Sequence, residues 1–156
     1  MTESSHVTDQ ARTLMGLTAV TLFCGRPDLS GVVTSLEMHR LEVESGLANI
    51  YEARGPSGSM RLTTGVFAPG SKFAHTILGA HNAVREAPGD EVPKSKVLHL
   101  LEICDLSVGV HFFPALGDEN DERLKGLLGA ARCTEGLIFD GFAFLDSELT
   151  PIVQVA

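Results

Sequence analysis

The segment from Ser107 to Leu145 constrains the fold more than any other part of the chain. It runs from an apolar stretch through a polar, acidic loop into a segment of helical periodicity, and then returns to an apolar stretch. Leu124, Leu127 and Leu128 recur at the spacing of one helix face, which predicts an amphipathic helix. We therefore expect a β-α-β unit whose helix covers a sheet.

The remaining chain mixes strands and helices. Apolar runs and turn residues predict strands at residues 17–24, 41–44, 48–53, 59–67, 108–113, 137–139, 142–145 and 152–155. Helices are expected to start near residues 31, 71, 93 and 118 and to end near 39, 87, 104 and 136. Only Thr18 and Thr21 are polar in the first strand, which indicates that both of its faces are covered.

This order of elements favours an α+β fold. The simplest arrangement is a two-layer sandwich, with helices on one face of a mixed sheet that contains one parallel crossover. A βαββαβ ferredoxin-like core with an appended αβ unit would satisfy it. A doubly wound α/β fold would require more crossovers and a glycine-rich turn after the first strand. We expect a disordered tail at residues 1–13 and a single domain at residues 14–156.

The charge of the chain excludes some classes of partner. Twelve basic and twenty acidic residues give a net charge of −8, which disfavours binding to nucleic acid or to an anionic membrane surface. An acidic surface suits a basic protein partner, although it also serves solubility. The three cysteines form no CxxC pair, which is typical of a reducing compartment. With neither a signal peptide nor a membrane-spanning apolar run, the sequence predicts a cytoplasmic protein.

Four residues are candidates for acid–base chemistry. His81 borders the apolar face of its predicted helix, and His111 lies in a predicted central strand, so either could act as a general base. Asp140 and Asp146 flank the last apolar strands, where carboxylates often face a cleft. The alternative interpretation is structural, with hydrogen-bonded core histidines and aspartates that cap turns.

A metal site is a second possibility. His99 and Glu102 are three residues apart on one helix face, and His111 of the next strand could complete a set of ligands. This spacing matches neither HExxH nor a Cys/His finger. The acidic cluster at residues 118–122 also fails the spacing of a calcium loop, and it suits the start of a helix. No cofactor is expected.

Residues 97–146 carry a set of structural motifs. A "VGVHFFP" strand is followed by an acidic helix start and by "GLIFDGFAFLD". The positions that stand out are Gly109, Pro114, Gly136, Asp140, Gly141 and Asp146. In these features the segment resembles uncharacterised bacterial α+β proteins. The resemblance implies a fold and carries no catalytic role.

Two functional hypotheses follow. The first is a non-enzymatic, cytoplasmic binding or interaction domain of bacterial origin, since the chain has no GxSxG, P-loop or GxGxxG motif. The alternative is a small hydrolase or transferase that uses His81 or His111 with Asp140 or Asp146. A homodimer that pairs the last strand, Ile152 to Val155, edge to edge is a further possibility.

Overall fold

The structure, a computed structural model, describes residues 16–66 and 71–155. The expected tail at residues 1–13 lies outside the described residues. The strands are β1 (Ala19–Cys24), β2 (Glu42–Ser45), β3 (Ile50–Gly55), β4 (Gly58–Val66), β5 (Leu106–Phe113), β6 (Leu137–Phe139), β7 (Ala143–Leu145) and β8 (Pro151–Gln154). The helices are α2 (Leu29–Met38), α3 (Lys72–Glu86), α4 (Glu91–Ile103) and α5 (Glu122–Cys133). The expected α+β class is confirmed.

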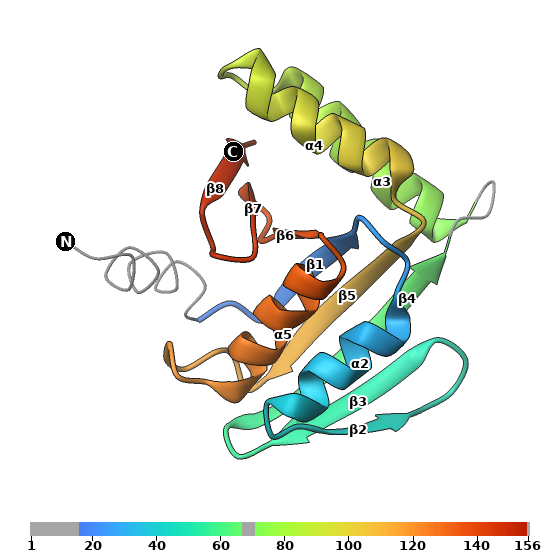
Figure 1. The fold of residues 1–156 in the computed structure, drawn as a ribbon, viewed down its shortest axis with the longest axis vertical. Helices are drawn as coiled ribbons and strands as arrows, with labels where there is room; N and C mark the ends of the chain where they lie inside the picture. The colour runs from blue at the N-terminus through green and yellow to red at the C-terminus, as the bar shows by residue number, and fades with distance from the viewer. Residues whose placement is uncertain (1–15, 67–70, 156) are drawn as a thin grey trace.

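All eight strands form one sheet in the order β2-β3-β4-β5-β1-β6-β7-β8 (Figure 1). Every pairing in this sheet is antiparallel, so the prediction of a mixed sheet is wrong. The expected β-α-β crossover exists as β5-α5-β6, but β1 lies between its two strands and pairs with both. Because β1 is apolar on both faces, it occupies the centre of the sheet and separates strands that run in the same direction.

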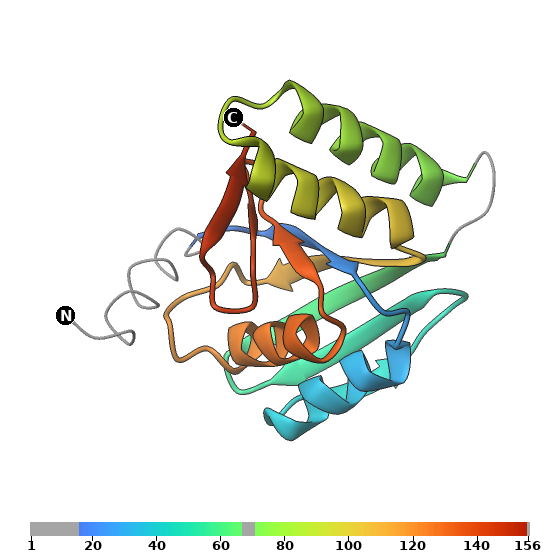
Figure 2. The same ribbon diagram turned by 45° about the horizontal axis from the view of Figure 1, so that its top comes forward.

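Helices lie on both sides of the sheet (Figure 2). Helices α2 and α5 pack on one face around Leu22, whereas α3 and α4 pack on the other face around Phe23 and Phe144. The prediction of helices on one face is therefore wrong. Leu22 and Phe23 are neighbours that point to opposite faces and are both at most 1% exposed, so each face needs its own apolar cover.

The pair of helices on the first face is held by close backbone approach. Asp28 caps α2 by accepting a hydrogen bond from the Gly31 amide. Ser35 of α2 donates a hydrogen bond to the carbonyl oxygen of Gly126 in α5. A Cβ atom on Gly126 would lie 2.9 Å from the Leu36 side chain, so this glycine allows the two helices to approach.

The acidic segment before α5 serves the fold. Asp121 caps α5 through the Arg123 amide, and its carboxylate also pairs with the buried Arg123 side chain at 2.8 Å. Burial alone raises the pKa of the Asp121 carboxyl, but the hydrogen bonds and the charge of Arg123 outweigh it and lower this pKa below 3.8. Glu122 accepts two hydrogen bonds from Ser57 in the β3–β4 turn. Asp121 thus serves the start of the helix, as the sequence predicts, and Glu122 links that start to the β3–β4 turn.

Within the described ranges, no helix combines the length and the apolar character needed to cross a membrane.

Candidate functional site

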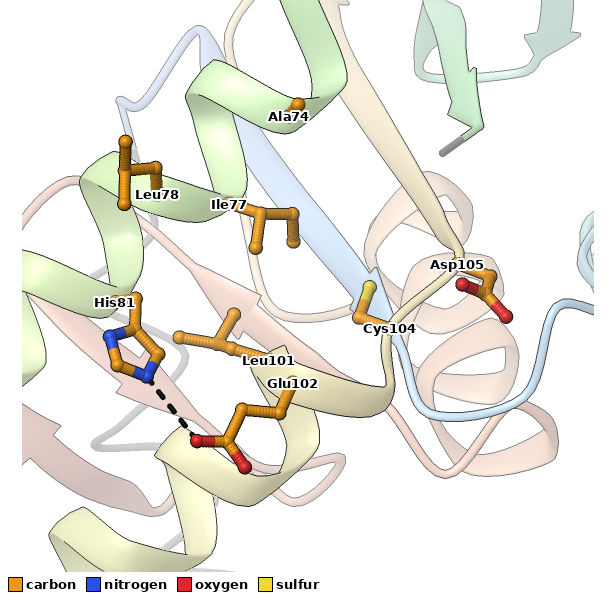
Figure 3. A pocket seen from close by; sticks show the side chains of 8 residues that line it. All are labelled: Ala74, Ile77, Leu78, His81, Leu101, Glu102, Cys104 and Asp105. Carbon is orange, nitrogen blue, oxygen red and sulfur yellow. Dashed lines mark ion pairs between the residues drawn. The ribbon is translucent and has the colours of Figure 1, made fainter. Parts of the chain in front are cut away.

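A groove with a volume of about 450 Å³ lies between α3 and α4 (Figure 3). One wall is a single stripe of α3 with side chains every three or four residues. The other wall comes from the last turn of α4 and the two residues after it. The lining residues are Ala74, Ile77, Leu78, His81, Leu101, Glu102, Cys104 and Asp105. The groove is mainly apolar, and its polar groups belong to His81, Glu102 and Asp105.

The α3–α4 hairpin is held by caps at both ends of α3. The Ser71 side chain accepts a hydrogen bond from the Ala74 amide at the start of the helix. At its end, the buried Lys94 side chain of α4 donates to the carbonyl oxygens of Ala87 at 2.8 Å and Arg85 at 3.2 Å. A cation there satisfies carbonyls that the helix leaves unpaired and complements the helix dipole. The two groove walls are therefore fixed relative to each other.

The histidine in the groove faces a carboxylate. The Nε2 atom of His81 lies 3.6 Å from Oε1 of Glu102, across the space between the helices (Figure 3). The His81 side chain is 24% exposed, so it is neither a fully buried core group nor a free surface group. Sequence reasoning found His81 but assigned Glu102 to His99 on its own helix. Only the relative placement of α3 and α4 identifies the pair, and no sequence signal reveals it.

Cys104 lies at the floor of the groove and is not an activated nucleophile. Its Sγ atom donates a hydrogen bond to the Leu106 carbonyl oxygen at 3.1 Å. Burial raises the pKa of the Cys104 thiol, so the reactive thiolate is disfavoured at neutral pH. Burial also raises the pKa of Cys24 to about 12. Both are buried free thiols.

The other acid–base candidates do not join His81 in the groove. His111 is exposed on β5, with Ala19 and Arg61 as its cross-strand neighbours, so it is not the core histidine of the structural interpretation. Asp140 accepts hydrogen bonds from two backbone amides in the β6–β7 turn. Asp146 does the same in the β7–β8 turn. The two aspartates thus have the turn-capping role that was their structural alternative.

The proposed metal ligands are also not assembled. In the ranges that the structure describes, no three or more His, Cys, Asp or Glu side chains are grouped so that they could hold a metal ion. His99 is exposed on α4, His111 is exposed on β5, and Glu102 faces His81.

The groove offers both apolar and acidic groups to a ligand. Its apolar floor and walls can take an apolar group, and the exposed carboxylates of Glu102 and Asp105 at its rim can pair with a cation next to that group. The described residues place no activated nucleophile there.

Comparisons with protein-family models, with curated proteins and with solved structures found no match to this chain.

Proposed function

We propose that the protein is a non-enzymatic binding domain whose site is the α3–α4 groove. Its ligand is a basic segment of a partner protein, in which an apolar side chain enters the groove and an adjacent Lys or Arg meets Glu102 and Asp105. The observation that carries this proposal is a mainly apolar groove of about 450 Å³ whose lining includes two exposed carboxylates. The net charge of −8 supports the same choice of partner, because it steers basic segments toward the protein.

Peptide selection tests this proposal directly. A displayed library of random short peptides is selected on the immobilised protein, and the enriched sequences are expected to contain an apolar residue next to Lys or Arg. Calorimetry on one synthetic peptide then gives its Kd for the wild type and the variants. Ala74→Leu fills the groove from the first turn of α3 and should weaken binding more than tenfold, since an apolar side chain loses about 1.5–3 kcal/mol of burial.

The carboxylates are tested with neutral variants. Glu102→Gln and Asp105→Asn should each weaken binding by up to about fivefold, the range expected for an exposed ion pair, and the loss should shrink at high salt. Glu119→Gln, an exposed carboxylate in the loop before α5, makes the same change in net charge and should leave Kd unchanged. The proposal is wrong if selection yields no consensus, or if the selected peptides bind Ala74→Leu as tightly as the wild type.

The second candidate function is a small hydrolase or transferase, and the His81–Glu102 pair is the observation in its favour. Here His81 would be the general base, and Glu102, rather than Asp140 or Asp146, would orient it. Turnover of simple activated esters that disappears in His81→Asn would support this function. Ester turnover that is the same in both proteins would exclude a role for His81.

We also infer that strands β6-β1-β5-β4 with α2 and α5 form a ferredoxin-like core. Two facts support this interpretation: both crossovers, β1-α2 to β4 and β5-α5 to β6, span one intervening strand, and α2 packs with α5. The β2–β3 hairpin, the α3–α4 hairpin and β7–β8 would be additions to it. On this interpretation the groove lies in an addition, not in the core.

A cytoplasmic, bacterial setting belongs to the same proposal. Support for the cytoplasm comes from three free cysteines, two of them buried, which fit a reducing compartment. Bacterial origin rests on the resemblance of residues 97–146.

A further inference from the structure

The two side chains that face each other across the α3–α4 groove form a contact whose charge depends on pH. The Nε2 atom of His81 lies 3.6 Å from Oε1 of Glu102, and Figure 3 shows the two groups pointing toward one another from different helices. The His81 side chain is 24% exposed and that of Glu102 is 63% exposed, so both are open to solvent and to its protons. Histidine is the residue that ordinarily changes its charge between about pH 5 and 8. The contact is therefore an ion pair only when the imidazole carries a proton.

Other charged groups lie close to this pair along the chain, because residues three or four apart are neighbours on a helix. The titratable and charged groups on the elements packed here are Arg85 on α3, His99 and Asp105 on either side of Glu102, and Arg61 on β4, which also contacts α3. Arg61 is already paired with Glu52 at 2.9 Å. His99 shares with His81 a charge that ordinarily changes in this pH range, so a test has to separate these two histidines.

We propose that protonation of His81 regulates the groove by withdrawing Glu102 from the ligand, so that a basic segment is held at neutral pH and is bound more weakly in acid. This inference rests on the proposed function, in which Glu102 meets a Lys or Arg of the partner. A neutral imidazole leaves the Glu102 carboxylate to that cation. An imidazolium pairs with Glu102 within the protein, and its positive charge also repels the cation of the ligand.

The size of the effect follows from the exposure of the carboxylate. An exposed ion pair contributes up to about fivefold to Kd, which is the loss expected for Glu102→Gln. The Asp105 carboxylate and the apolar lining still hold the ligand when Glu102 is withdrawn. Acid should therefore weaken binding by about fivefold without abolishing it.

Calorimetry at about pH 8 and about pH 5.5 tests the proposal with a synthetic peptide that was selected at the higher pH and contains no His, Asp or Glu. The Kd of the wild type should rise about fivefold at the lower pH, whereas that of His81→Gln, whose amide does not titrate, should change less than about twofold. His99→Gln controls for the other histidine beside Glu102. His111→Gln removes an exposed histidine outside the groove and controls for the general change in net charge. Both controls should respond to pH like the wild type.

A measurement without ligand separates this proposal from the proposed function. The carboxyl carbon of the Glu102 side chain is followed by nuclear magnetic resonance over the same pH range. Its resonance should move as His81 gains a proton and should move less in His81→Gln. Equal movement in the two proteins would show that the pair does not form, and would overturn the proposal.

The peptide measurements decide the regulation itself. Equal responses of Kd to pH in the wild type and in His81→Gln would overturn the proposal and leave the proposed function standing. Loss of the response in His99→Gln would overturn it as well, because the other histidine would then be the switch. If selection yields no peptide that binds the groove, both proposals fail.

Discussion

Replacing Arg123 with leucine should destabilise the protein far more than the same change at Arg61. Both guanidinium groups contact a carboxylate, at 2.8 Å for Arg123 with Asp121 and at 2.9 Å for Arg61 with Glu52. Both also lie over a phenylalanine ring, at 5.6 and 5.7 Å from its centroid. The carboxylate and ring partners therefore match in kind, whereas burial differs: the Arg123 side chain is 1% exposed and the Arg61 side chain is 51% exposed.

The expected magnitudes follow from that difference. Removing one partner of a buried ion pair leaves an uncompensated charge, here on Asp121, and costs about 3–5 kcal/mol. Arg123 also donates hydrogen bonds to the carbonyl oxygens of Ser59 at 3.0 Å and Pro114 at 2.6 Å, which would lose this donor. An exposed pair such as that of Arg61 contributes at most about 1 kcal/mol.

Urea unfolding followed by circular dichroism measures both losses. The midpoint of Arg123→Leu should fall strongly while that of Arg61→Leu stays near the wild-type value, with similar slopes for all three proteins. By heat, the Arg123→Leu loss corresponds to a decrease in Tm of about 6–20 °C for a chain of this size. Equal losses at the two positions would refute the argument that burial of the pair sets its contribution.

Three further predictions concern pH, a helix end and thiol reactivity. The pKa of Asp121 is lowered in the folded state, so the ionised carboxylate stabilises the folded protein fully above pH 3.8, and this contribution is lost as the pH falls through the folded pKa. Acid unfolding below pH 3.8 should therefore be steeper for the wild type than for Asp121→Asn. Lys94→Met leaves two carbonyl oxygens at the end of α3 without this donor, so it should cost about 1–3 kcal/mol and speed hydrogen exchange in the last turn of α3; unchanged exchange would contradict the capping role. Cys133 is exposed while Cys24 and Cys104 are buried, so Ellman's reagent should modify one thiol rapidly in the native protein and all three in denaturant.

Local residue patterns predicted the positions of helices and strands well, but they predicted the arrangement of these helices and strands in the fold poorly. The strands expected at residues 48–53 and 59–67 are β3 and β4, which form a hairpin, and those expected at 137–139 and 142–145 are β6 and β7, which pair across a turn with Gly141 at a φ of +100°. These succeed because turn chemistry acts within four residues. The mixed sheet and the single helical layer failed because neighbouring strands in space are chosen by burial across the whole chain, and local pattern does not encode that choice.

The site shows the same division. His81 stood out in the sequence as a histidine at the border of an apolar face, and it lies in the groove. Its partner Glu102 is 21 positions further along the chain, and the correct pairing depends on how α3 and α4 are aligned. Asp140 and Asp146 are carboxylates and so suited acid–base chemistry, but in the structure each accepts hydrogen bonds from backbone amides of its own turn.

The amino-acid sequence by itself determined where strands, helices and turns form, the acidic charge, and which faces must be buried. Periodicity, capping and turn preferences are local properties, so they can be read without the fold. Only the tertiary structure decided that β1 separates β5 from β6, that α3 and α4 enclose a groove, and that an uncharged strand ends the sheet. Those outcomes depend on contacts between distant segments, which are fixed by the requirement to cover both faces of one sheet at once.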